Sequence, residues 1–216
     1  MKDYILEVCV DSVESALAAE RGGATRLELC ANLVIGGTTP GYPLFEQVKK
    51  ETGLPVRTLI RPRFGDFLYT QYEHRQMIQD IRHFAQAGAD GVVIGSLNAD
   101  GTLNTEQMKE MMEAAGSCAV TMHRAFDVCA DPFEALKKSA ELGVDTILTS
   151  GQEADCLAGC GLLKKLVQLT DQSRSDSRRV TILAGAGVTS ANIAEIAKKT
   201  GVRAFHMSGK RLLESG

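Results

Sequence analysis

The chain has 216 residues, of which 44% are hydrophobic and 24% charged, a composition typical of a globular protein with one sizeable core. Its formal net charge is −3, so it lacks the basic field that attracts nucleic acid or an anionic membrane surface. No apolar run has the length of a membrane span, and the start Met1-Lys2-Asp3-Tyr4 lacks the pattern of a signal peptide. We therefore expect neither nucleic acid nor membrane as a partner.

Eight short apolar runs with the composition of β-strands recur along the whole chain. They are Tyr4–Val10, Arg26–Cys30, Pro55–Arg63, Gly91–Leu97, Ala119–Asp127, Thr146–Gly151, Val180–Gly187 and Arg203–Ser208. Amphipathic helices with readable start and stop signals lie between them. They are Val13–Arg21 after Ser12, Glu73–Ala87, Thr105–Ala115, Pro132 to the stop at Gly143, and a helix that opens at Thr189 or Ser190 and closes at Gly201.

Strict alternation of strands and helices favours a parallel sheet, and eight units suit closure into a barrel. The predicted fold is therefore α/β, a single (βα)8 TIM-type barrel over residues 1–216, and an open doubly wound sheet is the alternative. Only eight residues follow Ser208, so we expect the eighth helix to be short or missing. An uncovered strand exposes apolar surface, which predicts self-association, with a dimer as first choice.

The alternation of side chains along each strand predicts which of them face the barrel interior. Leu6, Val8 and Val10 form the apolar set that faces the helices, which turns Glu7 and Cys9 inward. The same reasoning turns further polar residues inward or toward the C-terminal ends of the strands, where α/β barrels carry their sites. These residues are Glu28, Cys30, Arg61, Arg63, His123, His206 and Ser208.

This polar set predicts a site for a small anionic or phosphorylated metabolite. Arg61 and Arg63 would hold the anion, with Glu7 and Ser208 nearby and amide donors from the loop at Gly185 and Gly187. The general acid or base would be Glu28 or His123, and the orienting residue His206 or Asp127, in an isomerase-like or lyase-like reaction. The structural alternative is that Arg61 closes an ion-pair network with Glu7 and Glu28.

Cysteine usage indicates a second kind of site. Six cysteines are scattered through a chain too large to need disulfides, so we expect reduced thiols and a cytoplasmic location. Cys9 and Cys30 lie inward on neighbouring strands, which are about 4.8 Å apart in a sheet. Soft thiolates select Cu(I) or zinc, and two thiols alone can hold Cu(I) in low coordination. The alternative is that both are small buried hydrophobes. No motif for an organic cofactor is present.

Short motifs in one order along essentially the whole chain resemble the CutC copper-homeostasis family. They are Glu7-Val8-Cys9-Val10-Asp11-Ser12, Glu28-Leu29-Cys30, Gly36-Gly37-Thr38-Thr39-Pro40, Ile60-Arg61-Pro62-Arg63, Gly65-Asp66-Phe67, Ala89-Asp90-Gly91, His123-Arg124-Ala125-Phe126-Asp127, Leu148-Thr149-Ser150-Gly151 and Phe205-His206-Met207-Ser208. The resemblance implies a cytoplasmic α/β barrel that self-associates. It also implies copper homeostasis through Cu(I) held by the thiols that match Cys9 and Cys30, and the metabolite enzyme remains the alternative.

Overall fold

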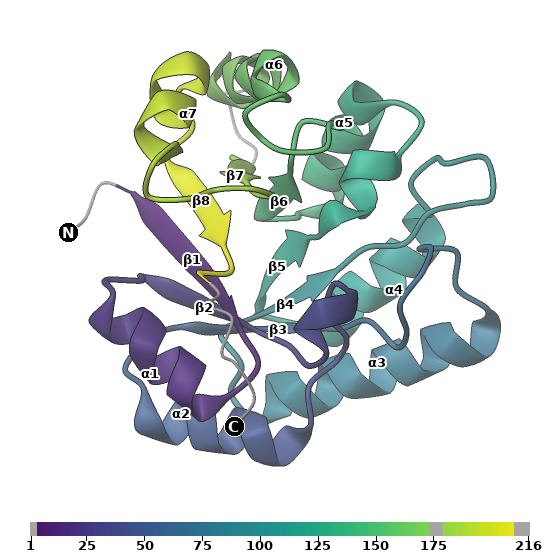
Figure 1. Cartoon of the computed structure of the whole chain (residues 1–216). Helices are drawn as coiled ribbons and strands as arrows, with labels where there is room; N and C mark the ends of the chain where they lie inside the picture. Colours follow the sequence, from purple (N-terminus) through teal and green to yellow (C-terminus); the bar gives the residue numbers. More distant parts are fainter. Residues whose placement is uncertain (1–3, 173–178, 210–216) are drawn as a thin grey trace.

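The computed structural model describes residues 4–172 and 179–209. Eight parallel strands follow one another around a closed barrel in chain order, and the last pairs with the first (Figure 1). The strands are β1 Ile5–Val10, β2 Arg26–Leu29, β3 Val56–Leu59, β4 Gly91–Ile94, β5 Ala119–Met122, β6 Thr146–Thr149, β7 Thr181–Ala184 and β8 Ala204–Met207. The (βα)8 TIM-type fold is therefore confirmed, and the open doubly wound sheet is excluded.

Helices cover the outside of the barrel (Figure 1). Within the described residues they are α1 Val13–Arg21, α2 Tyr42–Glu51, α3 Gln71–Gln86, α4 Thr105–Ala115, α5 Pro132–Leu142, α6 Cys160–Gln172 and α7 Ile193–Thr200, with 3-10 turns η1 Leu33–Ile35 and η2 Arg124–Val128. Local capping explains several boundaries. Thr70 and Glu73 form a reciprocal capping box at the start of α3, and Asp131 accepts hydrogen bonds from two backbone N–H groups at the start of α5.

Several predicted boundaries are wrong, and three of them bear on the site. The helix expected from Thr189 or Ser190 begins at Ile193, because the Asn192 side chain accepts a hydrogen bond from the Thr189 N–H at 2.8 Å and holds a turn there. The predicted strands also extend beyond the true ends of β3 and β5, so Arg61 and His123 lie in the connections that follow these strands. The expected short eighth helix falls on residues outside those described.

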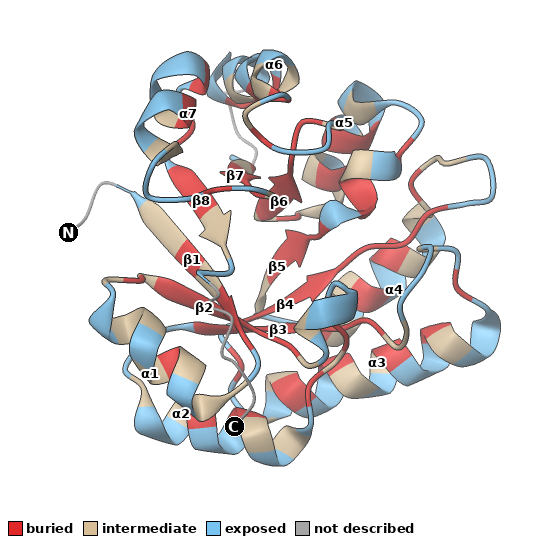
Figure 2. Ribbon diagram, viewed as in Figure 1, coloured by how far each residue is buried: buried red, intermediate tan, exposed pale blue. Residues whose placement is uncertain are grey.

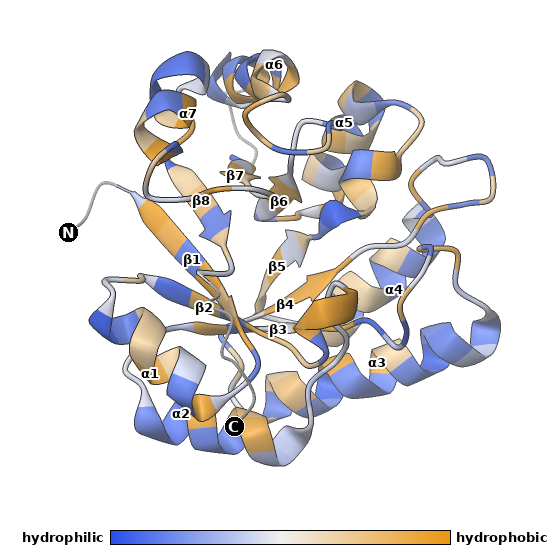
Figure 3. Ribbon diagram, viewed as in Figure 1, coloured by the Kyte–Doolittle hydropathy of each residue, from blue (hydrophilic) through white to orange (hydrophobic). Residues whose placement is uncertain are grey.

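The main apolar core lies between the strands and the helices. Figures 2 and 3 show largely buried strands, and helices that are buried and apolar on one side and exposed and polar on the other. Val10 belongs to this core and Leu6 and Val8 pack against it, which confirms the predicted helix-facing set of β1. Leu27 and Leu29 of β2 lie in the same core. Inside the barrel only two small apolar clusters occur among the described residues, one around Leu59 and Val93 and one around Leu148 and Leu183. Most of the remaining interior is polar. None of the described helices has the length and apolarity needed to cross a membrane.

Candidate functional site

A buried ion-pair network fills the interior between β1, β2 and β8. Glu7 has no exposed surface and accepts hydrogen bonds from both sides, from Arg26 Nε at 2.5 Å and from His206 Nδ1 at 2.8 Å. Burial by itself raises the pKa of Glu7, but the hydrogen bond from His206 and the charge of Arg26 outweigh it and lower the pKa to about 2. Burial opposes the charged imidazole of His206, yet Glu28, Cys9 and Glu7 raise its pKa well above the ordinary value. Glu7 is therefore a carboxylate paired with two cations.

Two interior arginines were missed by the sequence analysis. Arg26 precedes Glu28 by two residues on β2, and Arg57 precedes Arg61 by four, so the same alternation that selected Glu28 and Arg61 would have found them. The Arg57 guanidinium crosses the barrel and donates to the hydroxyl oxygens of Thr121 and, at 3.1 Å, Thr146. Arg26 and Arg57 supply the positive charge that balances the interior glutamates.

Glu28 is the least satisfied member of the network. Its Oε2 atom is buried and has no hydrogen-bond partner in the described part of the chain. Burial raises the pKa of Glu28 to about 7 in spite of the attraction of His206. Carboxylate and imidazole ligand atoms of Glu7, Glu28 and His206 lie within 4.8 Å of one another. Arg26 donates directly to Glu7, so a divalent cation bound there would meet the repulsion of a guanidinium at close range.

Arg61 does not join this network, and the predicted pairing with Glu7 or Glu28 is wrong. Its guanidinium donates to the carbonyl oxygens of Gly37 at 3.1 Å, Gly65 at 2.8 Å and Gly36 at 3.4 Å. The physical reason is position, since β3 ends at Leu59 and Arg61 therefore reaches the loops at the barrel mouth. The role foreseen for Arg61 in the ion-pair network belongs to Arg26.

His123 lies beside Arg61 at the mouth and is 5% exposed. The Ala125 N–H donates to His123 Nδ1 at 3.2 Å, which leaves the proton of the neutral ring on Nε2, and Nε2 is buried without a partner among the described residues. Burial and the charge of Arg61 lower the pKa of His123 to about 3, so the ring is neutral at physiological pH. Phe67 packs against both groups, with ring centroids 4.7 Å apart from His123 and 5.0 Å from the Arg61 guanidinium.

Five of the predicted polar residues therefore divide into two groups. Glu7, Glu28 and His206 lie in the interior network, and Arg61 and His123 lie at the mouth with Phe67. All of them lie at or near strands, as the alternation predicts, but they do not share one set of contacts.

Asp127 holds a loop and does not contact His206. Its carboxylate accepts hydrogen bonds from the Thr149 hydroxyl at 2.5 Å, the Ser150 N–H at 2.9 Å and Arg124 Nε at 2.7 Å. These bonds fasten η2 to the segment that follows β6. The predicted role of orienting His206 is therefore not supported by the contacts of this side chain.

Replacing Asp127 with Asn is expected to destabilise the fold by about 1–3 kcal/mol, because several charge-assisted hydrogen bonds to a buried carboxylate are lost. Urea unfolding followed by circular dichroism measures this. Asp100→Asn is the control, since Asp100 is exposed and bonds only Thr102 within its own turn. Equal unfolding midpoints for the two variants would contradict the loop-holding role.

The remaining predicted anion ligands are engaged elsewhere. Arg63 Nε donates to Glu73 at 2.5 Å and Arg63 Nη2 donates to Asp66 at 2.9 Å, so this arginine fastens its own loop. The Gly185 N–H donates to the Thr149 carbonyl at 3.0 Å and is not available to a ligand.

Gly187 and Ser208 are the other two predicted anion ligands. A Cβ on Gly187 would lie 3.0 Å from Cβ of Asp155, an acidic residue that disfavours an anion there. Ser208 is exposed. The role of these two residues in a phosphate loop after β7 and β8 stays a prediction.

Cys9 and Cys30 face the interior from neighbouring strands, as predicted, and both are buried free thiols. The register pairs Cys9 with Glu28 and Val10 with Leu29, so Cys30 lies two residues nearer the mouth than Cys9. Cys9 Sγ donates to the Met207 carbonyl at 3.7 Å, and Cys30 Sγ donates to the Val10 carbonyl at 3.5 Å. Burial, the charge of Glu28 and the neighbouring Cys9 raise the pKa of the Cys30 thiol. The two thiols are therefore diagonal neighbours and do not lie directly opposite each other.

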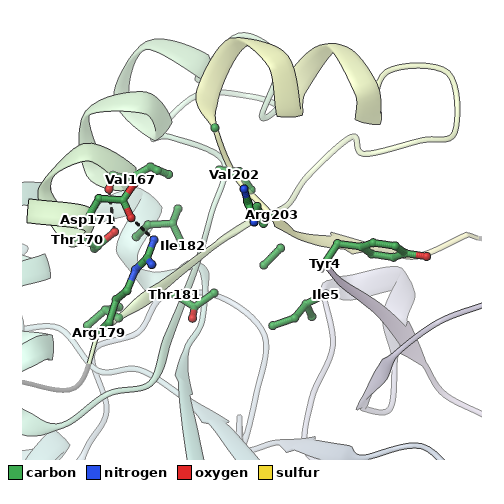
Figure 4. Close-up of a pocket in the computed structure, with 13 residues that line it drawn as sticks. Tyr4, Ile5, Val167, Thr170, Asp171, Arg179, Thr181, Ile182, Val202 and Arg203 are labelled. Carbon is green, nitrogen blue, oxygen red and sulfur yellow. Dashed lines mark hydrogen bonds and ion pairs between the residues drawn. The ribbon is translucent and has the colours of Figure 1, made fainter. Parts of the chain in front are cut away.

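A groove of about 710 Å³ lies at the N-terminal ends of β1, β7 and β8, the end of the barrel opposite to Arg61 and His123 (Figure 4). Tyr4, Ile5 and Ile182 line it, together with the ion pair between Arg179 and Asp171. It contains none of the predicted site residues, which lie in the barrel interior and toward the C-terminal ends of the strands.

Comparisons with known proteins agree with the motifs. The family model of the CutC family matches residues 4–211. A CutC family protein of Bacteroides fragilis is 48% identical over 217 residues, covering 100% of this chain and 84% of that protein. CutC of Streptococcus agalactiae, named as a proposed copper homeostasis protein, has a solved structure with TM-score 0.88 and 29% identity that covers 95% of this chain and 98% of its own.

More distant barrels share the fold alone. The 2,3-dimethylmalate lyase structure aligns with TM-score 0.63 at 14% identity, over 95% of this chain and 75% of its own. The family match covers nearly the whole chain, and the identity to curated relatives far exceeds that to these barrels. The chain therefore belongs to the CutC family.

Proposed function

We propose that this protein takes part in copper homeostasis by binding Cu(I) between the thiolates of Cys9 and Cys30. The observation that carries the proposal is the pair of buried free thiols facing one interior from adjacent strands. Membership of the CutC family and the description of the Streptococcus agalactiae relative support it. Free cysteines throughout the described chain support a reducing compartment, and we place the activity in the cytoplasm.

The donor set fits a soft monovalent cation as cargo. Thiolate sulfur is the ligand type that selects Cu(I), and two such ligands satisfy its low coordination. The Cys9 and Cys30 thiols donate long, weak hydrogen bonds to carbonyls, and Cys9 also interacts with the His206 side chain. Because burial and Glu28 raise the pKa of Cys30, that thiol is protonated at neutral pH, and Cu(I) binding must release its proton.

Replacing both Cys9 and Cys30 with Ser is expected to abolish stoichiometric Cu(I) binding and its proton release, because serine hydroxyls are poor ligands for a soft cation. Competition with a Cu(I)-specific chromophoric chelator under reducing conditions measures the affinity. Release of the Cys30 proton on copper addition is measured in weakly buffered solution.

The matched control is the double variant Cys118→Ser/Cys160→Ser, which removes two partly exposed thiols outside the barrel interior. It is expected to bind Cu(I) like the parent. If the Cys9/Cys30 variant folds and titrates like the parent, the thiol pair is not the copper site.

A further inference from the structure

Arg61 is a buried cation without a carboxylate partner in residues 4–172 and 179–209. It is 8% exposed, and its guanidinium contacts backbone carbonyls, the Phe67 ring and the Tyr69 side chain. By contrast, the interior Arg26 pairs directly with Glu7. Burying a charge without an opposite charge is costly, and carbonyl dipoles offset only part of that cost.

Two hydrogen-bond donors at the same place have no acceptor. Arg61 Nε and His123 Nε2 are both buried and unpartnered within the described residues. Because Ala125 donates to Nδ1, the neutral His123 ring presents an N–H at Nε2. Buried hydrogen-bond donors nearly always have an acceptor in folded proteins. These two donors lack one, and both side chains contact the Phe67 ring, which indicates a missing acceptor between them.

The surrounding loops hold these donors in place. Gly37 has φ +87, and a Cβ there would lie 2.8 Å from Leu59, so glycine is required for its carbonyl to reach Arg61. Gly95 has no side chain where the His123 ring packs, and a Cβ there would lie 2.6 Å from that ring. The arrangement fixes both side chains before any ligand arrives, which lowers the entropy cost of binding.

We propose that the barrel mouth binds a small organic anion, through a carboxylate or phosphate group that accepts hydrogen bonds from Arg61 Nε and His123 Nε2. The charge of the ligand balances the guanidinium, and its oxygens satisfy both donors. Among the described residues the thiols of Cys9 and Cys30 donate to other carbonyls and not to this site, although Gly37 lies between Cys30 and Arg61.

The test is thermal unfolding of the full chain with inorganic phosphate or malonate, each compared with sodium chloride at matched ionic strength. Preferential binding to the folded state raises the melting temperature of the parent with at least one of these anions at about 10 mM. A rise with phosphate alone or with malonate alone supports the site and identifies which group it takes. No rise with either anion overturns the proposal.

Variants test whether the rise in melting temperature depends on Arg61. Arg61→Met is expected to weaken anion binding by roughly 10- to 100-fold, the loss expected when a hydrogen bond from a charged donor disappears. Arg63→Met is the matched control, because Arg63 belongs to the same segment but is paired with Glu73 and Asp66, and it should keep the anion response.

His123→Phe keeps the ring and removes one neutral donor, so it provides a second test should Arg61→Met fail to fold. It is expected to weaken anion binding about tenfold. The variant Cys9→Ser/Cys30→Ser should retain the full anion response, which separates failure of this proposal from failure of the copper proposal. A full response in both Arg61→Met and His123→Phe overturns the assignment.

Discussion

Replacing Glu7 with Gln is expected to destabilise the fold by about 3–5 kcal/mol at neutral pH. Both carboxylate oxygens of Glu7 are engaged, one with Arg26 Nε and one with His206 Nδ1, and the side chain is completely buried. Glutamine keeps the shape and removes the charge, so a buried guanidinium and a buried imidazolium lose their counterion. Urea unfolding followed by circular dichroism measures the loss.

The contribution of Glu7 to the free energy of unfolding depends on pH. The pKa of Glu7 falls from 4.5 to about 2 on folding, so its stabilising effect is present above about pH 4.5 and is lost as the pH falls toward about 2. The difference between parent and Glu7→Gln should therefore shrink on acidification. The control Glu113→Gln changes an exposed glutamate on α4 and should stay within about 0.5 kcal/mol of the parent. An unchanged midpoint for Glu7→Gln at neutral pH would contradict the ion-pair network.

Replacing Glu28 with Gln is expected to have the opposite effect and to stabilise the fold above about pH 7, by up to about 3 kcal/mol. Burial raises the pKa of Glu28 from 4.5 to about 7, so the folded protein prefers the protonated carboxyl. Stability from this group is fully present below about pH 4.5 and is lost as the pH rises through about 7. A neutral amide of the same shape avoids that loss.

Unfolding of parent and Glu28→Gln between about pH 5 and 8 checks this, since the two stabilities should separate as the pH rises. Glu7→Gln serves as the matched comparison, because it makes the same chemical change on the neighbouring strand. If Glu28→Gln at about pH 8 is as destabilising as Glu7→Gln, Glu28 is an ionised and fully paired carboxylate, and the prediction is wrong.

The contrast between the two glutamates has a structural origin. Glu7 contacts two cationic groups directly, whereas the Oε2 atom of Glu28 is buried without a partner in the described chain. Desolvation acts on both, but only Glu7 has hydrogen bonds strong enough to overcome it. Two identical side chains on adjacent strands therefore have pKa values on opposite sides of the ordinary one.

The sequence by itself determined the barrel and the direction of its strand residues. Eight alternations of strand and helix predict closure, and the two-residue period of a strand is a local property that fixes which side chains point inward. Glu7, Cys9, Glu28 and Cys30 were placed inside on that basis, and the apolar core outside the strands confirms it.

Only the tertiary structure decided which of these residues meet. The register pairs Glu7 with Arg26 on one side and His206 on the other, and no local pattern specifies how two strands align. The end of β3 at Leu59 moves Arg61 out of the interior and into the loops, where Gly37 and Gly65 offer carbonyls. Partner choice depends on strand register and on where strands end, and both are set by packing between segments that are distant in the chain.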